Sequence, residues 1–248
     1  MQKLYVLNLV IIPTYNECEN IDLIVRYVLT KYNDYHILIV DDNSPDGTAL
    51  IVEKLKTEET FQNRLHLLKR EKKNGLGQAY ISGFRWALER DYSYIFEMDA
   101  DFSHNPKDLK KLLKACEEEN VDFSIGSRYV KGVNVVNWPM KRILISWFAS
   151  KYVRYLMRIP IKDSTAGFVC YKKEVLQKIN LDKIQFVGYA FQIEMKFKAL
   201  ALGFSYKEVP VIFTERKRGK SKMDGAIIYE AVLGVIYLKL KSIFGRIQ

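Results

Sequence analysis

Residues 94–104, with the sequence YIFEMDADFSH, place a short apolar run directly before two aspartates that are separated by one residue. Aromatic and β-branched residues in such a run favour a buried strand. In open sheets of parallel strands, ligands bind beyond the carboxyl ends of the strands. We therefore expect Asp99 and Asp101 to lie at a binding site.

Similar apolar runs recur on either side of this strand and alternate with longer amphipathic stretches. Strands are expected at residues 7–12, 36–40, 65–69, 94–98 and 122–126. Helices are expected at residues 20–29, 48–56, 77–90 and 106–119, the last with Asn105 as its cap and Pro106 at its first position. This alternation predicts an α/β fold with a Rossmann-like, mostly parallel sheet between helices.

The second half is less regular. Helices are expected at residues 141–157, 191–202 and 224–244, and strands at 168–171 and 208–213. No stretch rich in Pro, Gly or Ser separates two parts of the chain. We therefore expect one catalytic domain over residues 1–223, followed by an amphipathic C-terminal helix over residues 224–248.

Composition limits the class of protein. A chain of 248 residues with 48% hydrophobic residues can bury a real core, so disorder is not expected. The three cysteines and three histidines form no CxxC pair, and they predict neither a disulfide framework nor a zinc site. The beginning of the sequence lacks the features of a secretory signal, and a reducing compartment is expected.

The charge is uneven along the chain. Residues 1–137 contain 18 Lys and Arg against 21 Asp and Glu, whereas residues 138–248 contain 21 against 8. A basic half of this kind suits nucleic acid, an anionic membrane or a phosphorylated small substrate. Charge alone does not choose among these three partners.

Four polar segments follow the predicted strands. They are PTYNE at 13–17, DDNSPDGT at 41–48, MDADFSH at 98–104 and GSRY at 126–129. Carboxylates two residues apart, such as Asp99 and Asp101, suit Mg²⁺ or Mn²⁺ together with substrate phosphates. Two aspartates with this spacing, taken alone, often belong to an ordinary turn. Here Asp41 and Asp42 add a second acidic pair at a neighbouring strand end. An acidic residue at the position of Asp42 commonly contacts a ribose hydroxyl or the edge of a base.

Two common nucleotide-binding classes are disfavoured. Gly75 and Gly77 are followed by Tyr80 where the dinucleotide fingerprint needs a third glycine, and they do not lie in the first strand-to-helix turn. The GxxxxGK[ST] motif of P-loop enzymes is also absent. A nucleic-acid-binding module has no recognition motif here and leaves the acidic strand ends unexplained.

Nine segments in order resemble one family. They are PTYNE, DDNSPDGT, GLGQAYISG, MDADFSHNP, GSRY, WPMKR, DSTAGF, GYAFQIEM and ERKRGKSK. Together they resemble the dolichol-phosphate (polyprenol-phosphate) mannosyltransferases, which are inverting family 2 glycosyltransferases of GT-A fold. The resemblance extends from residue 6 to residue 223.

The resemblance implies a role for each matching residue. Pro13, Tyr15, Glu17, Val40 and Asp42 would hold the guanine and ribose of GDP-mannose. Asp99 and Asp101 would bind Mg²⁺ or Mn²⁺ and the diphosphate, with Ala100 alongside and Ser103 where some relatives carry Gln as a further metal ligand. Gln192, Glu194, Arg216 and Lys222 would contact the donor, whereas Arg128, Arg142 and Ser146 would bind the acceptor phosphate. Asp99, Asp101, Arg128 and Asp163 would be the catalytic residues.

The implied reaction is attack of a polyprenyl or dolichyl phosphate oxygen on the mannose anomeric carbon, with inversion and release of GDP. Transfer of glucose from UDP-glucose, or of N-acetylglucosamine, to a polyprenyl phosphate or to a different acceptor remains an alternative on the same fold. A nucleotidyltransferase of similar fold is a further alternative, although its early Gly-rich basic loop is missing.

A lipid acceptor requires contact with a membrane. The uncharged part of the last helix covers only residues 231–238, about 12 Å at 1.5 Å per residue, which is too short to span. On residues 142–159 one helical arc carries Leu144, Phe148, Tyr152, Tyr155 and Ile159, beside Lys151, Arg154 and Arg158. Such a helix either packs on the sheet or lies at a membrane surface. We expect peripheral attachment on the cytoplasmic side, and a membrane-anchored partner subunit is left open.

Overall fold

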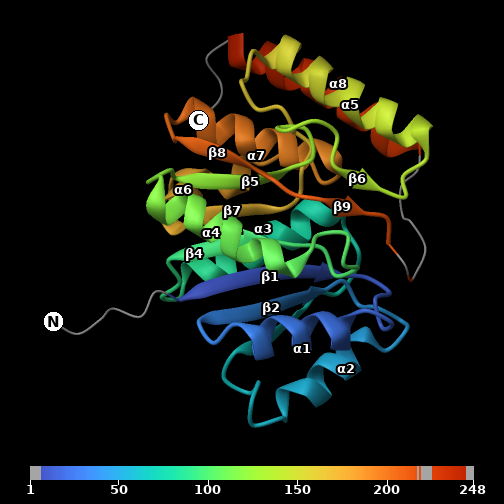
Figure 1. The fold of residues 1–248 in the computed structure, drawn as a ribbon, viewed down its shortest axis with the longest axis vertical. Coiled ribbons are helices and arrows are strands. Elements are labelled where there is room, and N and C mark those ends of the chain that lie inside the picture. The colour runs from blue at the N-terminus through green and yellow to red at the C-terminus, as the bar shows by residue number, and fades with distance from the viewer. Residues whose placement is uncertain (1–6, 217, 219–224, 244–248) are drawn as a thin grey trace, which may run out of the picture.

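The computed structural model describes residues 7–216, 218 and 225–243 (Figure 1). The first half alternates strands and helices in the order β1 (Asn8–Thr14), α1 (Ile21–Lys31), β2 (Tyr35–Asp41), α2 (Thr48–Lys56), β3 (Leu65–Lys69), α3 (Leu76–Leu88), β4 (Tyr94–Glu97), α4 (Leu109–Glu118) and β5 (Phe123–Ser127). The second half adds β6 (Val135–Val136), α5 (Met140–Met157), β7 (Val169–Lys172), α6 (Lys173–Lys178), α7 (Tyr189–Ala201), β8 (Tyr206–Pro210), β9 (Phe213–Thr214) and α8 (Gly225–Ile243). The expected α/β alternation is confirmed.

Seven strands form one sheet in the order β3-β2-β1-β4-β7-β5-β8. All neighbours are parallel except β7, which runs antiparallel to both β4 and β5. The antiparallel insertion of β7 between two strands that run parallel to each other is not readable from a local pattern, because strand order depends on distant contacts. The carboxyl ends of β1, β2, β4 and β5 consequently share one edge, as predicted.

The two faces of the sheet follow from residue alternation. In β1, Val10 and Ile12 enter a core with α1, α2 and α4, whereas Leu9 and Ile11 enter a second core with α3, α6 and α7. Successive side chains of a strand point to opposite faces, so a strand buried on both sides reads as a continuous apolar run. Each of these six helices covers the sheet with one apolar stripe.

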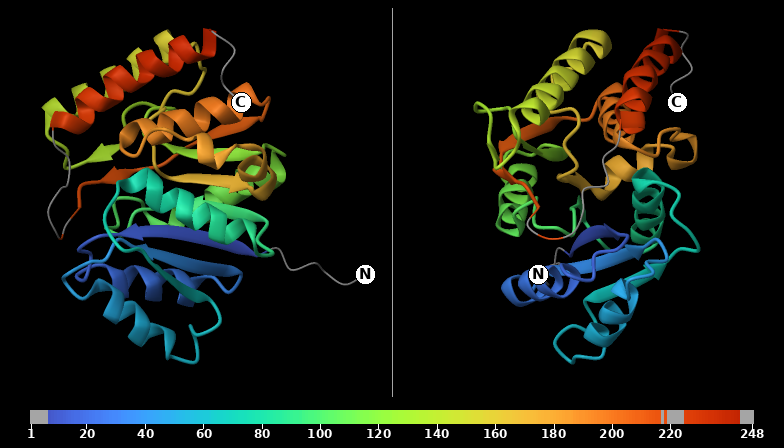
Figure 2. Two further views of the ribbon diagram at one scale, coloured as in Figure 1. Left: turned by 180° about the vertical axis from the view of Figure 1, so that it is seen from behind. Right: turned by 90° about the vertical axis from the view of Figure 1, so that its right-hand side faces the viewer.

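A third, smaller core joins α5 and α8 at one end of the molecule. Figures 1 and 2 show the two helices side by side, away from β1–β3. Val153 and Met157 of α5 pack with Val235 and Leu238 of α8. Gly234 lets α8 approach closely, because a β-carbon there would lie 2.6 Å from the ring of Phe186. Helix α5 therefore contacts α8 instead of lying on the sheet.

Two expected elements differ from those observed. Residues 208–213 were expected as one strand, which is wrong: β8 ends at Pro210, and β9 then pairs with β6 in a separate two-stranded sheet. The expected helix at 106–119 opens with a 3₁₀ turn, Pro106–Asp108, whose cap Asn105 accepts a hydrogen bond from Lys107 N (3.1 Å) as predicted. Within the described residues, no helix is both long enough and apolar enough to cross a bilayer.

Candidate active site

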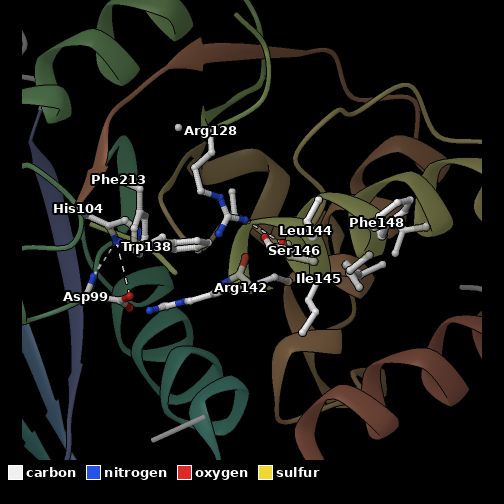
Figure 3. A pocket seen from close by; sticks show the side chains of 18 of the residues that line it. Asp99, His104, Arg128, Trp138, Arg142, Leu144, Ile145, Ser146, Phe148 and Phe213 are labelled. Carbon is white, nitrogen blue, oxygen red and sulfur yellow. Dashed lines mark hydrogen bonds and ion pairs between the residues drawn. The ribbon is translucent and has the colours of Figure 1, made fainter. Parts of the chain in front are cut away.

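A cavity of about 1050 Å³ opens between the carboxyl end of β4 and helix α5. Five of the predicted site residues line it, namely Asp99, Arg128, Arg142, Ser146 and Gln192. Figure 3 shows Asp99 at one side, Leu144, Ile145 and Phe148 at the other, and the two arginines with Trp138 between them. The cavity thus joins an acidic end, a cationic middle and an apolar wall.

The acidic end is a turn stabilised by its own side chains. His104 Nδ1 accepts a hydrogen bond from Asp99 N (3.1 Å), and Asp101 Oδ1 accepts one from Ser103 N (3.0 Å). The His104 ring stacks on Phe168, with centroids 4.9 Å apart. Burial lowers the pKa of His104 to about 4, so the ring is neutral at neutral pH and supports the turn as an acceptor. This role of His104 was not predicted.

Two carboxylates crowd together in this turn. Removal from bulk water, and then the neighbouring Asp101, raise the pKa of Asp99 to about 7. Arg216 opposes this effect, and its guanidinium lies 2.9 Å from Asp101 Oδ2. Such a site favours added positive charge because repulsion between the carboxylates would then be relieved.

The turn fits a divalent cation with help from a ligand. Ser103 Oγ, a predicted metal ligand, is buried without a hydrogen-bond partner. No group of three His, Cys, Asp or Glu side chains within the described part of the chain could hold a metal ion. Mg²⁺ characteristically combines one or two carboxylates with substrate phosphates and water. Asp99, Asp101 and Ser103 therefore suit an ion completed by a diphosphate.

The cationic middle is held by buried carboxylates. Asp163 is fully buried and accepts hydrogen bonds from Arg128 N, Nε and Nη2 at 2.8, 2.8 and 2.6 Å. Asp163 N in turn donates to Glu208 Oε1 at 2.9 Å. Asp163 therefore lies behind Arg128, where it orients the guanidinium, and it does not line the cavity.

Arg142 is held from two sides. Its Nη1 donates to both oxygens of Glu215, at 2.6 and 2.5 Å, and its guanidinium carbon lies 4.0 Å from the centroid of the Trp138 ring. The same ring lies 5.6 Å from the guanidinium carbon of Arg128. Trp138 thus separates two like charges while attracting both through its π face. Ser146, one turn after Arg142, accepts a hydrogen bond from Tyr129 Oη at 2.8 Å.

The residues predicted for the nucleoside lie at the ends of β1 and β2. Asp42 is buried against Arg70 (2.6 Å), while Asp41 accepts hydrogen bonds from Thr14 and Ser44 and so stabilises the turn. Burial raises the pKa of Asp42, and Arg70 opposes that rise. Glu17 is buried and lies 4.0 Å from Arg216, which links this edge to Asp101.

Other residues predicted for the donor are distributed differently. Pro13 and Tyr15 are partly exposed at the strand edge, and Ala100 is buried in the acidic turn. The Val40 side chain is fully buried in the core against α3, so only its backbone faces that edge. Lys222 lies outside the described residues.

Gln192 and Glu194 lie on α7 but point to different places. Gln192 lines the cavity, whereas Glu194 Oε2 accepts hydrogen bonds from Gln185 N (2.9 Å) and Phe186 N (3.1 Å). The structure does not bring Glu194 to the cavity: its carboxylate fixes the loop before α7.

Comparisons with known proteins agree with this geometry. The model of "Glycosyl transferase family 2" matches residues 9–179. The chain belongs to glycosyl transferase family 2. It is 48% identical over 227 residues to the polyprenol monophosphomannose synthase of Mycolicibacterium smegmatis, covering 92% of this chain and 84% of that protein. It is 45% identical over 227 residues to the undecaprenyl-phosphate mannosyltransferase of Micrococcus luteus, covering 92% and 91% respectively.

Solved structures share the fold at low sequence identity. Glucosyl-3-phosphoglycerate synthase from Mycobacterium tuberculosis, in complex with Mn²⁺, UDP-glucose and phosphoglyceric acid, matches with a TM-score of 0.70 and 14% identity. The match covers 94% of this chain and 80% of that one. This family 2 member is therefore a glycosyltransferase with the predicted GT-A fold.

Several residues of the site had no signal of their own in the sequence. Trp138 stands in the quoted WPMKR segment, yet its position between two arginines depends on the fold. Glu208 and Glu215 lie far along the chain from the arginine sites that they support, and Glu97 and Lys196 occupy positions that read as core. The only signal for Glu215 in the sequence was its place next to Arg216, at the start of the charged ERKRGKSK segment.

Proposed function

We propose that this enzyme transfers mannose from GDP-mannose to the phosphate of a polyprenyl or dolichyl phosphate, inverting the anomeric centre and releasing GDP. The observation that carries the proposal is the single cavity in which Asp99, two arginines and the apolar wall of α5 meet. A phosphate with a long apolar tail is complementary to the last two of these features, because its anionic head suits the arginines and its tail suits the apolar wall. Support also comes from relatives of 48% and 45% identity whose names specify polyprenol monophosphomannose synthesis and undecaprenyl-phosphate mannosyl transfer.

The acceptor phosphate would bind at Arg128 and Arg142. Guanidinium groups match phosphate oxygens geometrically, and charge-assisted hydrogen bonds are about twice as strong as neutral ones. The second pKa of a phosphate monoester is about 6, so the acceptor is largely dianionic at neutral pH and needs no general base. The main work of the protein is then to hold two anionic substrates in line.

The donor diphosphate would lie at the acidic turn. Asp99, Asp101 and Ser103 would hold Mg²⁺ or Mn²⁺, and Arg216 would exchange its contact with Asp101 for one with the diphosphate. The chemistry supplied by the bound ion would be neutralisation of the departing GDP. Pro13, Tyr15, Glu17 and Asp42 would surround the nucleoside at the neighbouring strand ends.

The apolar tail would enter from a membrane surface along α5. Large apolar side chains of this helix are exposed, including Leu144, Phe148 and Tyr155 at 48, 60 and 88%. Leu233, Ile236, Tyr237 and Leu240 extend the exposed apolar surface along α8. Neighbouring Lys151 and Arg158 suit anionic headgroups, each adding about 1 kcal/mol near such a surface. We propose peripheral attachment through these two helices.

The deciding experiment is a donor panel. Purified protein is incubated with polyprenyl phosphate, Mg²⁺ or Mn²⁺, and radiolabelled GDP-mannose, UDP-glucose or UDP-N-acetylglucosamine, and the product is extracted into organic solvent. Lipid-linked mannose of inverted configuration supports the proposal. Label transferred only from a UDP-sugar would replace the donor assignment, and no lipid-extractable product with any donor would reject the acceptor.

A further inference from the structure

A lysine is completely buried beside the cavity. Lys196 of α7 is 0% exposed, which is rare for lysine because an ammonium group loses its hydration on burial. Its Nζ donates to Ala166 O (2.6 Å), Gln192 O (3.1 Å) and Gln192 Oε1 (3.0 Å). An ammonium group has three N–H donors, so these contacts satisfy it completely.

A buried carboxylate lies on the other side of the same glutamine. Glu97, the last residue of β4, is also 0% exposed, and Gln192 Nε2 donates to its Oε2 at 2.5 Å. The Gln192 amide therefore lies between a group that can only donate and a group that accepts. A flipped amide would set NH₂ against the ammonium and oxygen against the carboxylate. Because the Lys196 ammonium group can only donate, it selects the orientation in which Oε1 faces Lys196 and Nε2 faces Glu97.

This orientation matters because Gln192 lines the cavity. Ala166 and Gly167 line it too, and a β-carbon placed on Gly167 would lie 3.7 Å from Gln192 Nε2. The amide nitrogen carries two hydrogens, and one of them is donated in the hydrogen bond to Glu97. Within the part of the chain that the structure describes, the other N–H has no acceptor, so it is available on the side of the cavity wall.

We propose that Lys196 and Glu97 are positioning residues that hold the Gln192 carboxamide so that its second N–H meets a hydroxyl oxygen of the donor sugar. The inference rests on the proposed function, because it assumes a nucleotide sugar in this cavity. Glu97 lies two residues before Asp99 on the same strand, so the network also ties Gln192 to the turn that would hold the diphosphate. Lys196 further fixes the Ala166 carbonyl, and with it the wall beside Gly167.

The test is a double-mutant cycle between Lys196 and Gln192. Lys196→Met removes the donors at similar size, and we expect kcat/KM to fall about 10- to 100-fold, as is typical of a misplaced group. If Lys196 acts through Gln192, the double variant Lys196→Met/Gln192→Met is no slower than Gln192→Met alone. Multiplying losses in the double variant would overturn the proposal.

Two further variants separate positioning from general damage. Lys196→Gln can still donate to Gln192 Oε1, and we expect it to recover most of the activity lost in Lys196→Met. Lys198→Met removes another lysine of α7, one that bonds to Lys183 O (3.1 Å), lies 3.7 Å from Glu194 Oε1 and does not line the cavity, and it should retain activity. Equal losses in Lys196→Gln and Lys196→Met would contradict the proposal.

A spectroscopic measurement needs no turnover and so separates this inference from the proposed function. The side-chain amide protons of Gln192, assigned by comparison with Gln192→Met, should be shifted downfield and exchange slowly with solvent. Glu97→Gln, the milder change if Lys196→Met fails to fold, should abolish the downfield shift. Ordinary, fast-exchanging signals in the unsubstituted protein would overturn the proposal, whereas failure of mannosyl transfer with a fixed amide would count only against the proposed donor and acceptor.

Discussion

Arg216 Nη2 lies 2.9 Å from Asp101 Oδ2, and the preceding residue, Glu215, accepts two hydrogen bonds from Arg142. One short segment after β9 therefore contacts the acidic turn with one side chain and the arginines of the cavity with the next. A cation bound at Asp101 would compete directly with Arg216. The acidic end and the cationic middle of the cavity are linked by two adjacent residues.

Substitution of either carboxylate of the acidic turn should abolish turnover. We expect Asp99→Ala and Asp101→Ala each to lower transfer at least about 1000-fold, because both the ion and the diphosphate lose their anchor. Chelation of divalent ions should have the same effect on the unsubstituted enzyme and be reversed by adding Mn²⁺. Release of GDP and lipid-extractable label are the measurements. Full activity in Asp101→Ala would remove the metal assignment.

Arg216→Gln should affect metal and donor in opposite directions. Without the competing guanidinium, Asp101 is expected to bind Mn²⁺ several-fold more tightly in the absence of nucleotide, since a partly exposed charge pair is worth about 1 kcal/mol. The KM for the nucleotide sugar should rise, because a phosphate contact is lost. Calorimetric Mn²⁺ titration and donor kinetics report the two effects. Weaker Mn²⁺ binding in the variant would contradict the competition.

Asp163→Asn should reduce activity without abolishing it. The substitution keeps the shape but removes the charge that faces Arg128, and breaking a buried pair costs about 3 kcal/mol of stability. We expect a roughly 10- to 100-fold loss in kcat/KM, mainly through the acceptor, because the guanidinium loses its fixed direction. Kinetics against acceptor concentration and thermal unfolding are the measurements. A variant unchanged in the acceptor KM and in kcat would show that the orientation of Arg128 is unimportant.

Phe148→Glu should weaken binding to anionic vesicles. The residue is 60% exposed on α5, and a carboxylate there is repelled by anionic headgroups and loses apolar contact. Flotation with liposomes containing anionic lipid is the measurement, at low and high salt. Leu50→Glu is the matched control, because Leu50 is 67% exposed on α2 at the opposite end of the molecule. Equal flotation of the two variants would refute attachment through α5.

Stability should fall in acid through a histidine far from the cavity. Burial, and then the neighbouring His36, lower the pKa of His66 to about 4 from its ordinary 6.5. The unfolded chain therefore binds a proton that the folded protein does not, and stability is lost as pH falls from about 6.5 towards 4. His66→Phe should show a smaller fall in melting temperature over this range than the unsubstituted protein. Identical pH profiles would mean that His66 is not responsible.

The elements of the fold were largely readable, and the exceptions have physical causes. Runs such as residues 65–69 and the stretch 48–56 have unambiguous periodicity, and β3 and α2 match them residue for residue. Residues 208–213 read as one apolar strand, but the chain leaves the sheet after Pro210 to pair with Val135 and Val136. A change of partner sheet has no local sequence signal, because both pieces have strand-like composition.

The candidate site was likewise predicted only in part from the sequence. The motifs predicted that Asp99, Arg128, Arg142 and Gln192 belong to one site, and the cavity brings these four together. They did not predict which carboxylates support the arginines. Asp163, for which the resemblance implies a catalytic role, lies behind Arg128, and no role was predicted for Glu215.

By itself, the sequence determined the α/β class, the shared edge of the strand ends and the residue types that meet there, because periodicity and turn chemistry are local. Only the tertiary structure decided that β7 enters the sheet antiparallel, that α5 lies on α8, and that Gln192 is held between Lys196 and Glu97. Those features depend on contacts between residues up to about a hundred positions apart, and the free energy of a buried charge is set by whichever groups the completed fold places around it.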